Sequence, residues 1–134
     1  MPIRIELVDQ HEILRDGLRR ILEGDPDFVV VAEAASEGEA VELARRHQPD
    51  VAIVDLGMRD LDGLKVTTWI LQHSPATRVL VLSLHTNERY VARAVNAGAR
   101  GYLLKDDVEA DLAGAIQAIH SGKSFISPAV GKMA

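Results

Sequence analysis

Four polar side chains follow short apolar runs in this sequence, and their types suit the chemistry of an anionic oxygen group. They are Asp9, Asp55, Ser83 and Lys105. Carboxylates brought close together repel, raise one another's pKa and favour a hard cation such as Mg²⁺, which takes oxygen ligands. A lysine ammonium can neutralise an added anion as a point charge, and a hydroxyl can donate a hydrogen bond to it. The set predicts a site for an anionic oxygen group beside a divalent cation, with a carboxylate available as nucleophile.

The elements that must position these side chains alternate regularly along the chain. The run before Asp55 is apolar and is bounded by turn residues, which indicates a strand buried on both faces. The sequence predicts five strands, at residues 3–8, 28–32, 51–55, 78–83 and 99–104, with an amphipathic helix after each. Strict alternation predicts a parallel sheet with right-handed crossovers and helices on both faces. In such a sheet the ends of strands one, three, four and five converge at one edge, where open α/β sheets place their ligands.

Taken singly, these residues are weak evidence. A lone Asp after a strand is more often a turn former or a helix cap. Ser83 alone would be a strand-end hydroxyl that caps a local backbone group, and Lys105 alone would be a solvated cation. The prediction therefore depends on all four occurring together in the right strand order.

Composition narrows the class of protein. The chain has 134 residues, 47% hydrophobic content, a formal charge of −5 and no cysteine. These values predict one domain, exclude disulfides and thiolate metal sites, and argue against non-specific nucleic-acid binding. The start of the chain lacks the pattern of a signal peptide, and the apolar runs have the length of strands rather than membrane spans. We expect a soluble, cytoplasmic chain with no contact with a membrane.

At the same residues the sequence resembles the receiver domain of two-component response regulators, over essentially its whole length. The matching motifs are Val8-Asp9-Gln10-His11, Val54-Asp55-Leu56-Gly57-Met58 leading to Asp62-Gly63, Leu82-Ser83, and Gly101-Tyr102-Leu103-Leu104-Lys105. The continuation Lys105-Asp106 and the tail Phe125-Ile126-Ser127-Pro128 resemble the NarL/FixJ (LuxR-type) subgroup, which carries a C-terminal helix-turn-helix. The resemblance implies an α/β, flavodoxin-like (CheY-like) doubly wound sheet of five parallel strands in the order 2-1-3-4-5.

The resemblance also implies roles for individual residues. Asp55 would accept a phosphoryl group from a sensor histidine kinase, and Lys105 would contact the phosphoryl oxygens. Asp9 would help to hold Mg²⁺ together with Asp55 and the backbone carbonyl of Gly57. Phosphoryl transfer needs positioning and charge neutralisation more than covalent machinery, which agrees with this residue set. The domain would then be a signalling module that at most catalyses its own phosphorylation and dephosphorylation, and not an enzyme.

Residues around this centre would form the switch and the mouth of the site. Ser83 would hydrogen-bond the phosphoryl group, and Tyr102 would turn inward as Ser83 moves. An added dianion of this kind can bias a two-state loop. We expect His85 to line the site mouth, with a plain surface histidine as the equal alternative. Arg59 would place a cation near the same mouth unless it is simply solvated.

Two departures from the family pattern bear on chemistry. The second acidic position at the end of the first strand is Gln10 here, whose carbonyl can coordinate Mg²⁺ but brings no charge. We therefore expect weaker Mg²⁺ binding and slower phosphorylation, unless Asp9 or His11 rearranges to compensate. Gly57 has no side chain beside the phosphoryl group, which leaves room for an attacking water and predicts a short phosphoryl lifetime.

Three other functions are the alternatives. A degenerate receiver would keep the fold and act as an interaction module because of Gln10. An aspartate-nucleophile phosphatase would need a second Asp where Gly57 stands, and a flavin carrier would need a phosphate loop in place of Gln10-His11-Glu12. We discount both of these enzyme and carrier functions.

Organisation and partners follow from the same resemblance. We expect a receiver domain over residues 1–122, and a tail or start of a linker over 123–134. Contact with DNA would require an output domain that this sequence does not contain. A homodimer through the first and last predicted helices would join Leu14 and Leu18 of the first to small apolar residues of the last, unless all of these pack on the sheet. The residues of the last helix are Val108, Ala113 and Ala118.

Overall fold

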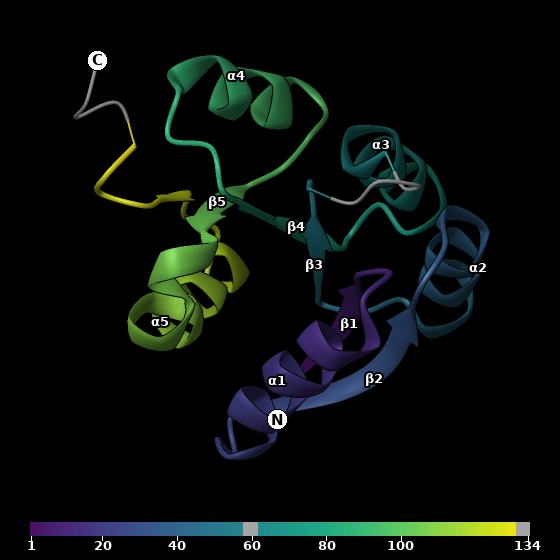
Figure 1. Cartoon of the computed structure of the whole chain (residues 1–134). Coiled ribbons are helices and arrows are strands. Elements are labelled where there is room, and N and C mark those ends of the chain that lie inside the picture. Colours follow the sequence, from purple (N-terminus) through teal and green to yellow (C-terminus); the bar gives the residue numbers. More distant parts are fainter. Residues whose placement is uncertain (58–61, 131–134) are drawn as a thin grey trace.

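The computed structural model describes residues 1–57 and 62–130, and strands and helices alternate along it (Figure 1). The strands are β1 (Ile3–Val8), β2 (Phe28–Ala34), β3 (Val51–Asp55), β4 (Arg78–Ser83), β5 (Gly101–Leu104) and β6 (Phe125–Ile126). The helices are α1 (Glu12–Glu23), α2 (Glu37–His47), α3 (Gly63–His73), α4 (Glu88–Asn96) and α5 (Val108–His120), with a 3₁₀ turn at Lys105–Asp107. The strands form one parallel sheet in the order β2-β1-β3-β4-β5-β6. The predicted order 2-1-3-4-5 is confirmed, and the sheet has one strand more than the five expected.

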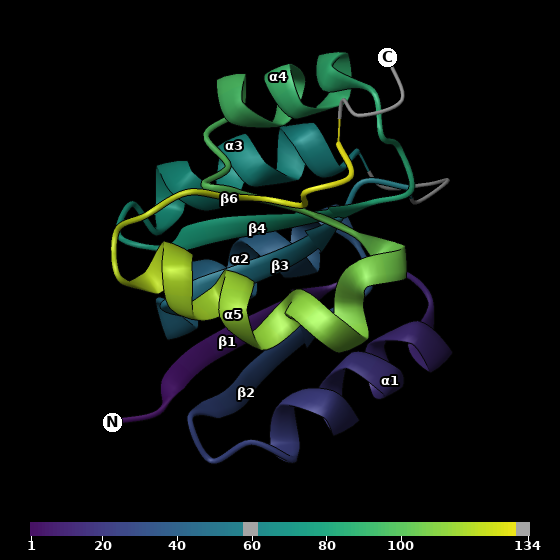
Figure 2. The same ribbon diagram turned by 90° about the vertical axis from the view of Figure 1, so that its left-hand side faces the viewer.

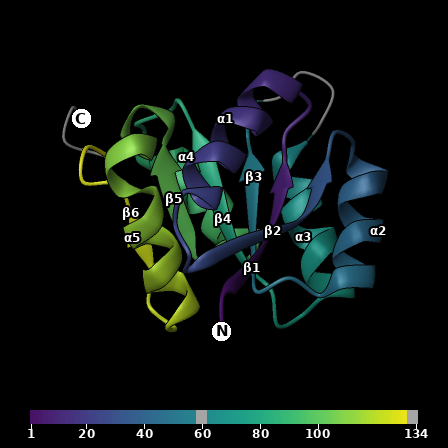
Figure 3. The same cartoon turned by 90° about the horizontal axis from the view of Figure 1, so that it is seen from below.

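Helices cover both faces of the sheet. The side that carries α1 and α5 is seen in Figure 2, where α5 lies in front of the strands, α1 below and α3 and α4 above; in Figure 3 α5 is at the left, α1 near the top and α2 at the right. On that side, β1, β3 and β4 pack against the buried faces of α1 and α5. On the other side, small and β-branched residues of the strands pack against α2, α3 and α4. Within the described ranges, no helix has the length and apolar character needed to cross a membrane.

Local signals in the sequence explain where helices begin and end. Ser36 starts α2, and its Oγ accepts a hydrogen bond from the Glu39 amide at 3.3 Å. The Glu39 carboxylate in turn accepts from the Ala35 amide at 2.8 Å, one residue before the N-cap, so the capping box expected here forms with its return bond shifted by one residue. Asn87 caps α4 through the Arg89 amide. Gly98 follows this helix at φ +109°, a conformation that favours glycine.

The sixth strand comes from the tail, where the sequence shows no clear pattern. Phe125 and Ile126 pair with Gly101 and Tyr102 of β5. Beyond them, Ser127 donates its amide to the Tyr102 carbonyl at 2.9 Å, and its Oγ accepts from the buried Leu104 amide at 2.9 Å. A two-residue strand is too short for any periodicity, so its position is set by the unpaired edge of β5. The tail up to Val130 therefore packs against the sheet that ends at the candidate site.

Candidate functional site

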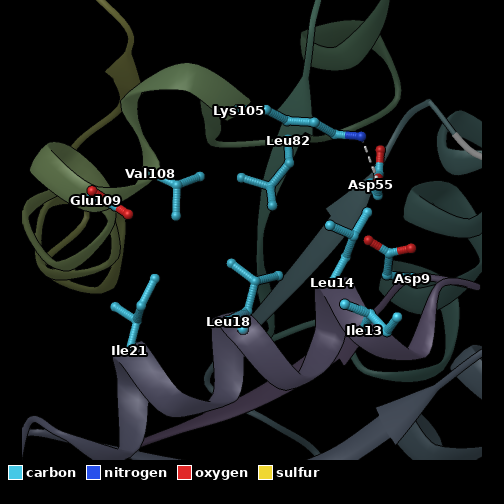
Figure 4. A pocket seen from close by; sticks show the side chains of 11 residues that line it. Asp9, Ile13, Leu14, Leu18, Ile21, Asp55, Leu82, Lys105, Val108 and Glu109 are labelled. Atoms are coloured by element: carbon cyan, nitrogen blue, oxygen red, sulfur yellow. Dashed lines mark ion pairs between the residues drawn. The ribbon is translucent and has the colours of Figure 1, made fainter.

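Asp55 is the last residue of β3, and it is 1% exposed. Its Oδ2 lies 2.7 Å from Nζ of Lys105, and its Oδ1 accepts a hydrogen bond from the Gly57 amide at 2.7 Å (Figure 4). Lys105 directly follows β5, so the ion pair spans the carboxyl ends of two strands. Each carboxylate oxygen of Asp55 thus has one positive or donor group beside it.

Asp9 follows β1 and is likewise buried. Its Oδ1 accepts from the His11 amide at 2.9 Å and lies 3.1 Å from Nδ1 of the His11 ring. Burial raises the pKa of the Asp9 carboxyl, the hydrogen bonds from His11 lower it, and the nearby Asp55 carboxylate raises it further. Nη1 of Arg15 donates to the Asp9 backbone carbonyl at 2.5 Å, a contact that the sequence pattern did not indicate.

This donor set fits a hard divalent cation. Asp9 and Asp55 place two buried carboxylates at neighbouring strand ends, and the Asp55 carboxylate disfavours ionisation of Asp9 in the absence of a counter-charge. A Cβ at Gly57 would lie 3.3 Å from Oδ1 of Asp55 and 3.4 Å from Nζ of Lys105, so glycine leaves the space beside both groups open. In the part of the chain that the structure describes, no three His, Cys, Asp or Glu side chains gather as metal ligands. Gln10, an amide, stands where the family pattern has a second acidic residue.

Ser83 and Tyr102 lie together at the neighbouring strand ends. Ser83 ends β4 and is fully buried, and its Oγ accepts from the His85 amide at 3.0 Å. Tyr102 is 1% exposed, and its hydroxyl donates to the His85 backbone carbonyl at 2.8 Å. Burial raises the pKa of the Tyr102 hydroxyl, while a hydrogen bond with Ser83 lowers it. The ring of Tyr102 is thus already inside in this structure, whereas the resemblance implied that it turns inward only as Ser83 moves.

The two residues expected at the site mouth have different outcomes. The ring of His85 stacks on the ring of Tyr90 in α4, with centroids 3.8 Å apart and planes 6° apart. It is therefore the backbone of His85, and not its imidazole, that contacts the switch residues. Arg59 lies outside the described residues.

A groove leads from the site along the surface between α1 and α5 (Figure 4). Its volume is about 280 Å³, and it runs from Asp9, Asp55 and Lys105 past an apolar floor. Six residues of the sequence recur at the spacing of one helical face of α1, but only Leu18 and Leu22 of them are buried; the six are Ile13, Leu14, Gly17, Leu18, Ile21 and Leu22. Ile13, Leu14 and Ile21 are 85%, 49% and 41% exposed and line the groove. The helix predicted here is confirmed, but most of its apolar face is exposed to solvent.

The comparison with known families agrees with this geometry. The family model for the response regulator receiver domain matches residues 5–117. The chain belongs to the response regulator receiver domain family.

Similar proteins place this receiver domain in the subgroup that the sequence indicated. It is 40% identical over 129 residues to the transcriptional regulatory protein DegU of Brevibacillus brevis, covering 96% of this chain and 54% of that protein. It is 37% identical over 130 residues to the response regulator protein VraR of Staphylococcus aureus, covering 97% and 62%. A crystal structure of a LuxR-family two-component response regulator from Aurantimonas sp. SI85-9A1 superposes with a TM-score of 0.91 at 39% identity, covering 98% of this chain and 94% of that one. The chain therefore spans little more than half the length of these curated relatives.

Proposed function

We propose that Asp55 is the phosphoacceptor of this receiver domain and that its phosphorylation by a sensor histidine kinase switches a regulator of transcription. The observation that carries the proposal is the buried Asp55 carboxylate, held between Nζ of Lys105 and the Gly57 amide with open space beside it. The names of similar proteins, a transcriptional regulatory protein and LuxR-family regulators, support the output. DNA would be contacted only by an output domain outside this chain.

The chemistry is transfer of a phosphoryl group from a phosphohistidine to a carboxylate. An oxygen of Asp55 forms the new P–O bond as the P–N bond breaks, and the bonding pair leaves with the imidazole nitrogen of the kinase. Lys105, which balances the charge of Asp55 at rest, would contact the oxygens of the incoming group. The Ser83 hydroxyl would donate to the same group. The domain acts as a signalling partner and not as an enzyme with a separate substrate.

Mg²⁺ is the cofactor that this donor set suits. Asp9, Asp55, the backbone carbonyl of Gly57 and the side-chain carbonyl of Gln10 would hold it. Bound there, it would supply positive charge against the phosphoryl oxygens. Because Gln10 contributes no charge, we propose that Mg²⁺ binds more weakly than it would with a third carboxylate in the site.

The groove between α1 and α5 supports the partner assignment. It opens onto Asp55, and its exposed Ile13 and Leu14 offer apolar contact beside the phosphoacceptor. We propose that this face receives the kinase and, in the active state, a second receiver domain. On α5, Ala113 is exposed and Val108 is half-buried, so both can contribute to such a contact. A cytoplasmic location is consistent with this role.

The test is the intact mass of the protein after incubation with acetyl phosphate, with and without Mg²⁺, beside an Asp55→Asn control. We expect a Mg²⁺-dependent gain of one phosphoryl group that the control lacks. If folded protein gains no phosphoryl group even at high Mg²⁺, the proposal is wrong and the domain is a degenerate receiver that acts as an interaction module.

A further inference from the structure

We infer that His85 is the positioning residue of the switch. Its backbone holds the hydroxyls of Ser83 and Tyr102 in the resting arrangement, and the stack of its ring on Tyr90 sets how readily Ser83 turns toward a phosphoryl group on Asp55. The inference rests on the proposed function, because it concerns the group that Ser83 would bind. It assigns a role to a ring stack that neither the sequence motifs nor the proposed chemistry requires.

The first observation is that one residue makes both switch contacts. The His85 amide donates to Oγ of Ser83 at 3.0 Å, and the His85 carbonyl accepts from the Tyr102 hydroxyl at 2.8 Å. Ser83 lies at the end of β4, and Tyr102 lies on the adjacent β5. The peptide groups of His85 thus connect the two strand ends through the loop that follows β4.

The second observation is that the ring of His85 attaches this loop to α4. The residues of the loop are exposed, Leu84 at 66% and His85, Thr86 and Asn87 as well. Among these exposed side chains, the imidazole of His85 lies flat on Tyr90, whose own side chain is half-buried and packs against the core. Arg93 lies over the Tyr90 ring at 5.9 Å and helps to fix its position.

These contacts oppose the movement that phosphorylation needs. Tyr102 is already inside, so the part left to move is the loop of residues 84–87 rather than the ring. Asp55 lies on β3, the other neighbour of β4, so a Ser83 hydroxyl that turns toward Asp55 draws away from the His85 amide. The loop must then shift as well, and the stack on Tyr90 resists that shift. A weaker stack should therefore release Ser83 more often.

Two matched pairs of variants separate the effect of the ring stack from the effects of the backbone hydrogen bonds and of the apolar volume. His85→Ala removes the ring and His85→Phe keeps a flat ring, and both retain the backbone N–H and C=O that contact Ser83 and Tyr102. Tyr90→Leu removes the aromatic partner but keeps apolar volume against the core, and Tyr90→Phe keeps the ring. Hydrogen exchange of the residue 85 amide in unphosphorylated protein reports the resting contact. The rate of phosphorylation by acetyl phosphate with Mg²⁺ reports its consequence.

We expect His85→Ala and Tyr90→Leu to exchange this amide about two- to tenfold faster than the wild type, the range that an aromatic pair commonly contributes. Both should also be phosphorylated faster by a similar factor, while the two Phe variants stay near the wild type. Equal amide exchange in all five proteins would overturn the inference even if wild-type Asp55 is phosphorylated. Faster exchange without faster phosphorylation would also overturn it, since the stack would then be structural only. A wild-type chain that takes no phosphoryl group would instead count against the proposed function itself.

Discussion

Glu6, in the middle of β1, is the residue whose substitution should change stability most strongly with pH. Its side chain is fully buried, and within the described residues neither carboxylate oxygen has a hydrogen-bond partner. It pairs with Ala32 of β2 and Ala52 of β3, whose small side chains leave room for it. Burial raises the pKa of Glu6 from 4.5 to about 8, so the folded protein holds this carboxyl protonated at neutral pH.

The sign and size of the effect follow from linkage. Between pH 4.5 and about 8 the folded state keeps a proton on Glu6 that the unfolded state has lost. The free energy of unfolding therefore falls by about 1.4 kcal/mol for each pH unit across this window. It is highest below pH 4.5 and is lost as pH rises through the folded pKa of about 8. Between pH 5.5 and 7.5 the contribution of Glu6 alone amounts to about 2.5 kcal/mol.

The assay is urea unfolding of the wild type and Glu6→Gln at pH 5.5, 6.5 and 7.5. We expect the wild type to lose about 2.5 kcal/mol relative to Glu6→Gln over this range, because the amide does not ionise. Glu6→Leu should behave like Glu6→Gln in its pH dependence and be more stable, since it leaves no polar group buried. Glu23→Gln, at an exposed carboxyl of α1, is the control and should keep the wild-type pH dependence. The reasoning is refuted if Glu6→Gln and the wild type lose stability in parallel, within about 0.5 kcal/mol over the range.

Two further predictions concern the metal site and the tail. Gln10→Asp should tighten Mg²⁺ binding by about tenfold or more, because it adds a negative oxygen ligand beside Asp9, whereas the neutral Gln10→Asn should leave the affinity unchanged. Titration calorimetry measures the affinity of both variants for Mg²⁺. Equal affinities of the two variants would contradict a charge deficit at this position. Ser127→Ala should lower the free energy of unfolding by about 1–3 kcal/mol because it leaves the buried Leu104 amide without its acceptor. Ser124→Ala, at an exposed residue of the same tail, should change urea unfolding little. Equal effects of the two tail variants would mean that residues 123–130 do not stabilise the domain.

Much of the fold was predictable because its signals are local or strongly periodic. The apolar runs of β3 and β4 have turn residues or a break on both sides, and their predicted bounds are the observed ones. The Ser36 capping box and the C-terminal Gly98 are short patterns with one physical meaning each. The polar residues of the site were predictable for a different reason, since parallel strands must end at one edge.

What the sequence did not predict depends on contacts between distant segments. Glu6 alternates with Ile5 and Leu7, a pattern typical of a half-exposed strand, yet β1 is central and both of its faces are covered. The same limitation applies to α1, because the sequence does not show which residues of its apolar face pack in the core and which line the groove. Ile13 and Leu18 are alike in type and differ only in which of them the sheet and α5 can reach. No local pattern carries that information.

The switch is the clearest case of a role that depends on packing rather than on residue type. Ser83 could be picked out from its position at a strand end and Tyr102 from the family resemblance, but neither signal gives the direction of the Tyr102 ring. That ring is already inside, and its hydroxyl donates a hydrogen bond to the His85 carbonyl, so our proposal does not make the tyrosine the group that moves first. On our proposal, movement would start in the loop after β4, and the stack of His85 on Tyr90 is the contact that resists it. A phosphoryl group at Asp55 would act on that loop through Ser83, so the surface that α4 presents to a partner would change with the loop and not with the tyrosine.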